Sequence, residues 1–260
     1  MTGSGVLWES ASGGYRMRSG EVHVWRAGLD WASDFIDKWY RILSPDERKH
    51  ADAFHFPADR VRHIVGRAVT RLLIGRCLGV APAAVIFAYG ERGKPRLTAD
   101  LGYAALNFNI SHSGDHILVA LAYRRELGID IERIRMDIDT VLIAKRWFSA
   151  NEYSILAGLP ARLRHEAFFQ CWTRKEAYIK ARGDGLSIVL TDFDVAFLPG
   201  EEPRLLETRN DPSDVLRWTV RNLDVGATHK AALVVEGSDV RLRCWEWPGE
   251  LPPPPAADAV

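Results

Sequence analysis

The stretch from Asn107 to Glu132, NFNISHSGDHILVALAYRRELGIDIE, constrains the fold of this chain more than any other. It holds two runs of β-forming residues, FNIS and HILVALA, separated by the turn sequence HSGD. In a third run, Leu127 to Ile134, two isoleucines alternate with Asp130 and Glu132. Because side chains alternate between the two faces of a strand, both acids share one face. The stretch therefore predicts a hairpin followed by a strand that presents two carboxylates.

Two carboxylates on one strand face repel each other unless a cation lies between them, and magnesium prefers oxygen ligands. Asp130 and Glu132 are therefore candidate metal ligands, although a solvated strand face without a ligand is the alternative. A helix predicted from Arg164 to Arg182 adds a third carboxylate, Glu176, with lysines on either side. An ordinary surface Glu–Lys pair is the alternative there. Taken together, the acids and lysines predict a magnesium site for a phosphorylated ligand.

Composition excludes several classes of protein. At 260 residues the chain is long enough for one large or two small domains, and its formal net charge of zero argues against binding nucleic acid or a membrane surface. The three cysteines lack metal-ligand spacing and are interpreted as free thiols in a reducing compartment. No signal peptide or membrane-spanning run is recognisable, which predicts a soluble cytoplasmic protein. The motifs of P-loop, Rossmann and α/β-hydrolase enzymes are also missing.

The chain is expected to form a mixed α+β fold of two similar halves. Each half contains one long helix, Asp59 to Leu78 or Arg164 to Arg182, and a glycine follows each of them. The segments DHILVALA and THKAALVV resemble each other, which indicates duplication of one unit. The expected divisions are a flexible N-terminus (1–20), an N-terminal half (21–126), a C-terminal half (127–250) and a disordered Pro-rich tail (251–260).

Shorter elements are predicted from caps and alternation. Ser44 and Ser149 each open a short helix with N-cap chemistry. A further helix is expected from Asp137 to Phe148. The predicted strands outside the central stretch are Glu21–Ala27, Thr191–Phe197, Leu216–Leu223, Lys230–Val235 and Val240–Trp247.

Five motifs, in this order along the chain, resemble those of the Sfp-type 4'-phosphopantetheinyl transferases. They are GKP at 93–95, FNISHSG at 108–114, GIDIE at 128–132, FSANEY at 148–153 and WTRKEAYIKARGDGLS at 172–187. The resemblance spans roughly residues 44 to 235. It implies a monomeric pseudo-dimer of two similar halves, each with a sheet packed on a long helix, and an active site between the halves.

The resemblance also implies an activity. Members of this family move phosphopantetheine from coenzyme A to a serine hydroxyl of an acyl, peptidyl or aryl carrier protein, with Mg²⁺, and release 3',5'-ADP. Asp130, Glu132 and Glu176 match the metal ligands, and Glu176 and Lys180 match catalytic positions. Nearby carboxylates favour the charged form of Lys180, so we prefer it as a charge stabiliser. Glu176 or a metal-bound water would then take the serine proton.

Contacts to coenzyme A follow from the same resemblance. Matching positions for the phosphates and the nucleotide are Ser111, His112, Lys94, Lys175 and Arg62. One departure concerns the first short helix, where some relatives place lysines for the 3'-phosphate and this chain has Glu47 and His50. Arg48 is the expected substitute.

Two alternatives to this activity remain open from the sequence: another magnesium-dependent phosphotransferase, and a non-catalytic paralogue that binds coenzyme A. For the carrier protein, the segment Val141 to Leu159 is a candidate docking face. Its apolar residues would contact the carrier and its cations would face an acidic partner, unless the aromatics are all core. These apolar residues are Ile143, Trp147, Phe148, Tyr153 and Leu156, and the cations are Lys145 and Arg146.

Overall fold

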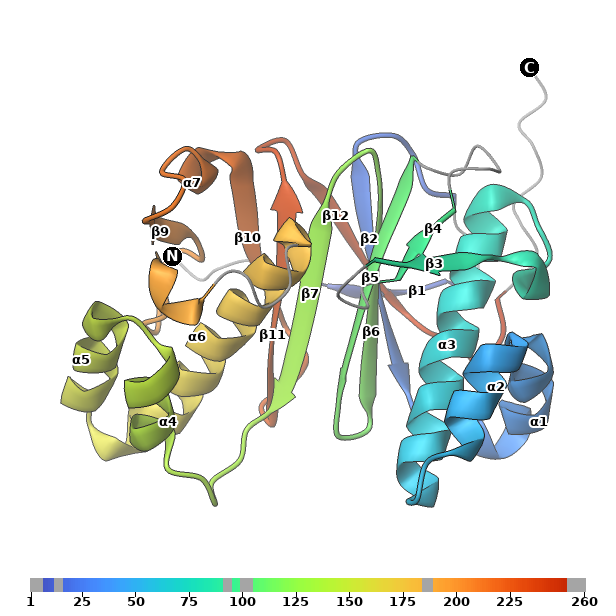
Figure 1. Ribbon diagram of the computed structural model, residues 1–260, viewed down its shortest axis with the longest axis horizontal. Helices are drawn as coiled ribbons and strands as arrows, with labels where there is room; N and C mark the ends of the chain where they lie inside the picture. Colours follow the sequence, from blue (N-terminus) through green and yellow to red (C-terminus); the bar gives the residue numbers. More distant parts are fainter. Residues whose placement is uncertain (1–6, 12–15, 91–94, 99–104, 184–188, 252–260) are drawn as a thin grey trace. The chain divides into compact units, whose positions relative to one another are not determined.

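The computed structural model describes residues 7–11, 16–90, 95–98, 105–183 and 189–251. They divide into two compact units, each of which combines helices with sheet (Figure 1). The N-terminal unit contains Leu7–Gly90, Pro95–Arg124 and the segment from Arg241 onward, and the C-terminal unit contains Arg125–Val240. The mixed α+β fold expected from the sequence is confirmed.

A five-stranded sheet in the order β1-β12-β2-β6-β5 organises the N-terminal unit. Its strands are β1 (Trp8–Ser10), β2 (Glu21–Gly28), β5 (Leu106–Ser113), β6 (His116–Tyr123) and β12 (Arg241–Glu246). Strands β5 and β6 form the predicted hairpin, in which Ser113 pairs with His116. Gly114 in its turn has φ of 60°, a conformation that glycine adopts without a steric cost.

Strand β12 differs most from the expected division of the chain. It was expected in the C-terminal half, 127–250, but it lies between β1 and β2 and runs parallel to both. Parallel neighbouring strands need a long connection between them. For β2 and β12 that connection includes the whole C-terminal unit, which follows β6 and precedes β12 in the chain. The expectation of a flexible segment 1–20 is wrong for Trp8–Ser10, because β1 pairs with β12. The expected disordered tail lies outside the described residues, apart from Leu251.

Three helices complete the N-terminal unit, together with the short turn η1 (Pro82–Ala84) and the hairpin β3 (Phe87–Tyr89) and β4 (Pro95–Leu97). Helix α1 (Ala32–Ile42) was not predicted. Its apolar residues are nevertheless spaced for one face, and Phe35 stacks on Trp39 at 5.5 Å between ring centroids. Helix α3 (Pro57–Leu78) is the predicted long helix and ends at Gly79, whose φ of 69° is left-handed.

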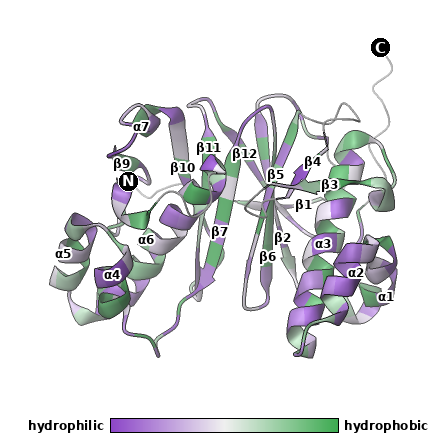
Figure 2. Ribbon diagram, viewed as in Figure 1, coloured by the Kyte–Doolittle hydropathy of each residue, from purple (hydrophilic) through white to green (hydrophobic). Residues whose placement is uncertain are grey.

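Helix α2 (Pro45–Asp52) is mostly hydrophilic (Figure 2), and Ala51 is its one buried apolar residue, so apolar burial contributes little to its placement. Glu47 holds it in place instead. Its side chain closes the predicted capping box with Ser44 and accepts a hydrogen bond from Arg71 Nε of α3 at 2.7 Å. Both side chains of this ion pair are 2% exposed. The acid that replaces an expected lysine in this helix is therefore a structural residue.

The C-terminal unit is built on an antiparallel sheet in the order β10-β11-β7. The strands are β10 (Trp218–Leu223), β11 (His229–Glu236) and β7 (Leu127–Arg133), and a small hairpin joins β8 (Phe193–Val195) to β9 (Leu205–Thr208). Its helices are α4 (Thr140–Trp147), α5 (Ala150–Gly158), α6 (Ala161–Arg182) and α7 (Asp214–Arg217), with the turn η4 (Leu190–Asp192). The capping box predicted at Ser149 is present.

The two units share features that the sequence echo predicted. Helices α3 and α6 are both 22 residues long and both end at a left-handed glycine. The similar segments DHILVALA and THKAALVV form β6 and β11, each an interior strand of its sheet. The three cysteines are free thiols, as expected. Within the described part of the chain, no helix is both long and apolar enough to cross a membrane.

The insertion of β12 predicts a large stability cost for one substitution. Trp245 is 6% exposed, stacks on Trp25 at 5.6 Å and donates from Nε1 to His23 Nδ1 at 3.2 Å. We expect Trp245→Ala to lower the free energy of unfolding by about 3–5 kcal/mol, because it leaves a cavity and removes the hydrogen bond from Trp245 Nε1 to His23. Urea unfolding followed by far-UV circular dichroism measures this loss.

The matched control is Leu216→Ala, which removes an apolar side chain that is 88% exposed. It should change the free energy of unfolding by less than about 0.5 kcal/mol. A Trp245→Ala loss no larger than that of the control would mean that β12 contributes little to the sheet.

Candidate active site

Strand β7 and helix α6 approach each other so closely that only glycine fits between them. A Cβ atom on Gly128 would lie 2.2 Å from the Ala177 carbonyl oxygen and 2.3 Å from the Ala181 nitrogen. Both distances are far inside van der Waals contact. Because Gly128, Asp130 and Glu132 share one face of the strand, both acids project on the side that α6 covers.

Asp130 is held by a lysine of α6. The aspartate is 3% exposed, and its Oδ1 accepts a hydrogen bond from Lys180 Nζ at 2.6 Å. The same ammonium donates to the Ile129 carbonyl oxygen at 3.2 Å. Charge-assisted hydrogen bonds of this kind are stronger than neutral ones. The predicted metal ligand and the predicted catalytic lysine are therefore direct neighbours.

Glu176 lies one helical turn before Lys180 and belongs to the same group. Burial raises the pKa of its carboxyl, the negative charge of Asp130 raises it further, and Lys180 acts in the opposite direction. The structure thus brings Asp130, Glu176 and Lys180 together from two elements. Glu132 is half-buried two residues farther along β7, opposite Lys230 of β11.

The donor chemistry of this group fits a divalent cation. Three carboxylates supply oxygen ligands only, which magnesium prefers. Burial raises the pKa of Glu176 most, and the charge of Asp130 adds a smaller repulsion that a cation would relieve. As far as the described residues go, the three acids do not place one oxygen each within 4.8 Å of one another. Sharing one ion would therefore require Asp130, Glu132 and Glu176 to turn toward each other.

Lys175 does not lie where its predicted role requires. Its side chain is fully buried, and Nζ donates to Glu152 Oε2 and to the Phe193 carbonyl oxygen, both at 2.6 Å. A phosphate could reach this ammonium only if the core of the unit opened. The structure therefore contradicts a direct contact between Lys175 and coenzyme A.

Predicted phosphate contacts gather at one end of the N-terminal unit. Ser111 and His112 lie near the end of β5; Ser111 is 7% exposed, whereas His112 is exposed to solvent. Arg62 of α3 reaches the same hairpin, because its Nε donates to the Gly114 carbonyl oxygen at 3.0 Å. A second guanidinium nitrogen of Arg62 contacts Asp59. The hairpin thus carries a hydroxyl and an imidazole on consecutive residues of β5, whose side chains leave opposite faces of the strand, and an arginine at its turn. Each of these groups can donate to an anion.

Other predicted nucleotide contacts lie on or near α2. Arg48 is half-buried and contributes to the lowered pKa of Asp52, after the hydrogen bonds from Tyr40 and Arg60. The ring of His50 packs against that of His63 at 4.8 Å between centroids. Burial, followed by the charge of Arg67, lowers the pKa of His63 to about 4, so this imidazole is neutral at pH 7. Lys94 lies outside the described residues.

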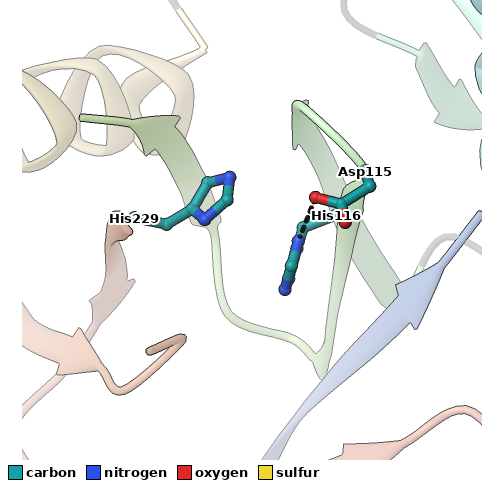
Figure 3. A group of neighbouring side chains, drawn as sticks. All are labelled: Asp115, His116 and His229. Atoms are coloured by element: carbon teal, nitrogen blue, oxygen red, sulfur yellow. Dashed lines mark hydrogen bonds and ion pairs between the residues drawn. The ribbon is translucent and has the colours of Figure 1, made fainter. Parts of the chain in front are cut away.

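The hairpin turn holds a further pair of titratable groups. Asp115 Oδ1 and His116 Nδ1 are 2.8 Å apart and hydrogen-bonded (Figure 3). Asp115 is largely exposed, since its side chain keeps 73% of its accessible surface. The third side chain drawn in Figure 3, His229, belongs to the C-terminal unit, where its Nδ1 pairs with Thr228 Oγ1 at 2.9 Å.

Two residues of the candidate site were not recognised from the sequence. A glycine inside a strand pattern, two residues before Asp130, was the available signal for the close approach at Gly128. Glu152 was identified only as a capping residue, because the capping box explains its position locally. Its additional partner, Lys175, is 23 residues away, and no local pattern links the two.

Comparisons with known proteins agree with the geometry. Residues 126–234 match the family model described as the 4'-phosphopantetheinyl transferase superfamily, and residues 31–124 match the model of the N-terminal part of a 4'-phosphopantetheinyl transferase. The chain is 38% identical to 4'-phosphopantetheinyl transferase HetI of Nostoc sp. (strain PCC 7120), over 88% of this chain and 93% of that protein. It is 34% identical to 4'-phosphopantetheinyl transferase Sfp of Bacillus subtilis (strain 168), over 61% and 68% of the two chains.

Family models and relatives of this kind identify the chain as a 4'-phosphopantetheinyl transferase enzyme. The chain belongs to the 4'-phosphopantetheinyl transferase superfamily, of the Sfp type. The resemblance seen in the five sequence motifs is thereby confirmed.

The electrostatics of the acid cluster predict how stability depends on pH. Because the pKa of Glu176 is raised in the folded chain, its contribution to stability is fully present below pH 4.5, the ordinary glutamate value, and is lost as pH rises through the raised pKa. Glu176→Gln removes the free-energy cost of carrying an ionised carboxylate at this position in the folded chain. In the presence of EDTA, we expect the variant to be more stable than wild type at pH 7 and to lose that advantage toward pH 4.5.

Urea unfolding at a series of pH values checks this expectation. Glu166→Gln is a suitable control, since Glu166 is exposed on the same helix. An advantage of Glu176→Gln that stayed constant across the pH range would show that charge at Glu176 is not its source.

Proposed function

We propose that this protein transfers the 4'-phosphopantetheine group of coenzyme A to a serine hydroxyl of an acyl, peptidyl or aryl carrier protein, with Mg²⁺ as cofactor. The observation that carries the proposal is the group formed by the buried Asp130 of β7 and the half-buried Glu176 and Lys180 of α6. Removing a carboxylate from water costs free energy, and groups of ionisable residues with a perturbed pKa occur mainly at functional sites. Phosphoryl transfer is one reaction that needs such charged groups, because they stabilise charge in the transition state.

The proposed reaction replaces one phosphorus–oxygen bond by another. The serine oxygen forms a bond to the phosphorus atom that carries the pantetheine, and the bond from that atom to the bridging pyrophosphate oxygen breaks. The leaving group is 3',5'-ADP, and the serine loses its proton. Mg²⁺ bound by Asp130, Glu132 and Glu176 would neutralise charge on the pyrophosphate.

Residues of α6 would handle the proton and the developing charge. Glu176 lies on the side of α6 that faces β7, one helical turn before Lys180, and would accept the serine proton there. Lys180 donates a hydrogen bond to Asp130 and is suited to stabilise negative charge on the phosphate. This assignment keeps Lys180 as a charge stabiliser.

The N-terminal unit would supply most contacts to the donor. Arg62, Ser111 and His112 lie at the same hairpin and offer donors for phosphate oxygens. Arg48 would take the 3'-phosphate in place of the lysines that relatives use, and Lys94 would contact coenzyme A. The active site between the two halves, the monomeric state and a location in the cytoplasm remain predictions from the sequence.

The activity test is modification of an apo carrier protein. We expect mass spectrometry to show that the carrier gains one phosphopantetheine when incubated with the enzyme, coenzyme A and Mg²⁺. Asp130→Ala should lower the rate at least about 100-fold, because charge stabilisation in the transition state is lost. Leu216→Ala, exposed in the same unit, should react at the wild-type rate.

Other results would point to another function. Cleavage of coenzyme A without modified carrier favours a different magnesium-dependent phosphotransferase. Binding of coenzyme A without any reaction favours a non-catalytic paralogue. An Asp130→Ala variant within tenfold of wild type would remove Asp130 from the proposed metal site.

For the carrier protein, the structure refines the predicted docking face. Phe148 and Leu156 are at most 3% exposed and belong to the core, and Ile143 and Tyr153 pack against it, so these apolar residues are not available as predicted. Trp147 is 42% exposed. The exposed surface of α4, here called the α4 patch, consists of Leu142, Lys145, Arg146 and Trp147.

The α4 patch combines apolar and basic groups. Leu142 is 64% exposed, and the Arg146 guanidinium lies 5.0 Å from the centre of the Trp147 ring. Family resemblance leads us to expect an acidic helical carrier, which would place apolar residues on Leu142 and acids near the two cations. Leu142 was not among the apolar residues predicted for this face, because its exposure follows from the packing of α4 and not from its residue type.

Charge reversal tests this docking face. We expect Lys145→Glu with Arg146→Glu to slow carrier association about tenfold or more at low salt and to flatten its salt dependence, with coenzyme A affinity unchanged. Stopped-flow kinetics at several salt concentrations measure both effects. Arg162→Glu with Arg204→Glu makes the same change in net charge at exposed positions outside α4. Equal slowing in both double variants would show a general charge effect and no docking at the α4 patch.

A further inference from the structure

Consecutive residues of α6 have opposite environments. The side chain of Lys175 is fully buried and paired with Glu152, whereas Glu176 lies one helical turn before Lys180, whose Nζ donates to Asp130 of β7 at 2.6 Å. Successive side chains on a helix are about 100° apart around its axis. The side chain that anchors the helix and the side chain that faces β7 are thus next to each other in the sequence.

The Lys175–Glu152 pair is fully provided with hydrogen bonds. Besides its two oxygen acceptors, the Lys175 ammonium lies 4.1 Å from the centre of the Phe193 ring. Glu152 accepts from the Val195 nitrogen at 2.9 Å and from the Ser149 nitrogen at 3.0 Å. Two side chains therefore connect α6, the start of α5 and β8.

Stability alone does not explain this pair. Taking two charges out of water costs several kcal/mol for each ion, and well-packed apolar residues in their place often leave a protein equally stable. Directional bonds differ from apolar contacts in what they fix. The aromatic residues of α6, such as Phe168, Phe169 and Trp172, pack without a preferred bond direction and permit small rotations of the helix. The Lys175–Glu152 bonds do not.

The opposite side of α6 is held at a fixed distance by Gly128, where the backbones nearly touch. Distance is therefore set on one side of the helix and rotation on the other. A rotation of α6 about its axis would move the Glu176 carboxylate relative to Asp130 without altering the contact at Gly128 greatly.

We propose that Lys175 and Glu152 are positioning residues that fix the rotation of α6 and thereby place the Glu176 carboxylate beside Asp130. The proposal rests on the proposed function, in which these acids hold a divalent cation. It replaces the direct contact with coenzyme A that the family resemblance implies for Lys175.

The test uses a neutral replacement of the pair, Lys175→Met with Glu152→Gln, which keeps similar side-chain volumes and one acceptor oxygen. We expect its affinity for Mn²⁺, measured from the electron paramagnetic resonance of the free ion, to fall about 10- to 100-fold, as is typical when partners of metal ligands are lost. Its affinity for coenzyme A in EDTA, measured by calorimetry, should equal that of wild type.

Val220→Ala is the control for stability, because Val220 is a buried apolar residue of β10 in the same core and has no polar group. Its Mn²⁺ affinity should stay within twofold of wild type. If circular dichroism shows the double variant to be unfolded, Glu152→Gln alone serves, since Lys175 keeps its bond to the Phe193 carbonyl oxygen. The same loss of Mn²⁺ affinity is then expected.

Outcomes separate this proposal from the proposed function. Unchanged Mn²⁺ affinity in a folded pair variant overturns the positioning role and leaves the activity intact. Reduced coenzyme A affinity with unchanged Mn²⁺ affinity overturns it in favour of a direct contact by Lys175. Absence of Mn²⁺ binding and of carrier modification in the wild-type protein overturns the proposed function itself.

Discussion

The backbone contact between β7 and α6 at Gly128 is the constraint on which the candidate site depends. No side chain separates the two elements there, so Asp130 comes within hydrogen-bond distance of Lys180, and the half-buried Glu176 lies one helical turn before that lysine. In water each of these acids would be solvated separately. The fold instead concentrates negative charge in a low-dielectric environment, and only nearby cations can compensate for it.

The charged side chains on the two sides of helix α6 differ in how they are paired. Toward β7, Asp130, Glu176 and Lys180 lie together, and burial followed by the charge of Asp130 raises the pKa of Glu176. Toward β8 and α5, Lys175 and Glu152 neutralise each other and leave nothing for a ligand. Because buried polar groups occur on both sides, apolar patterning alone does not determine the orientation of this helix. The paired charges add the missing specification.

Local patterns predicted much of this structure. Alternation identified β7 with its two acids, the caps at Ser44 and Ser149 located two short helices, and glycines ended both long helices. What failed depended on distant partners. The pattern of β12 indicates a strand but not the neighbours it pairs with, and Lys175 lies next to Glu176 in the sequence although the helical step separates their side chains. The α4 patch required knowledge of exposure, which decides that Phe148 is core and Leu142 is not.

The position of β12 also has a consequence for biosynthesis. The ribosome synthesises a chain from the N-terminus to the C-terminus, and domains commonly fold in the order in which they are synthesised. Here the sheet of the N-terminal unit lacks β12, which lies between β1 and β2, until residues 241–246 leave the ribosome, long after β2 and β6. The C-terminal unit has its complete sheet before that point. During translation the C-terminal unit can therefore fold before the N-terminal unit is complete. Until β12 is synthesised, the edge of β2 is unpaired and exposed to aggregation or chaperone binding.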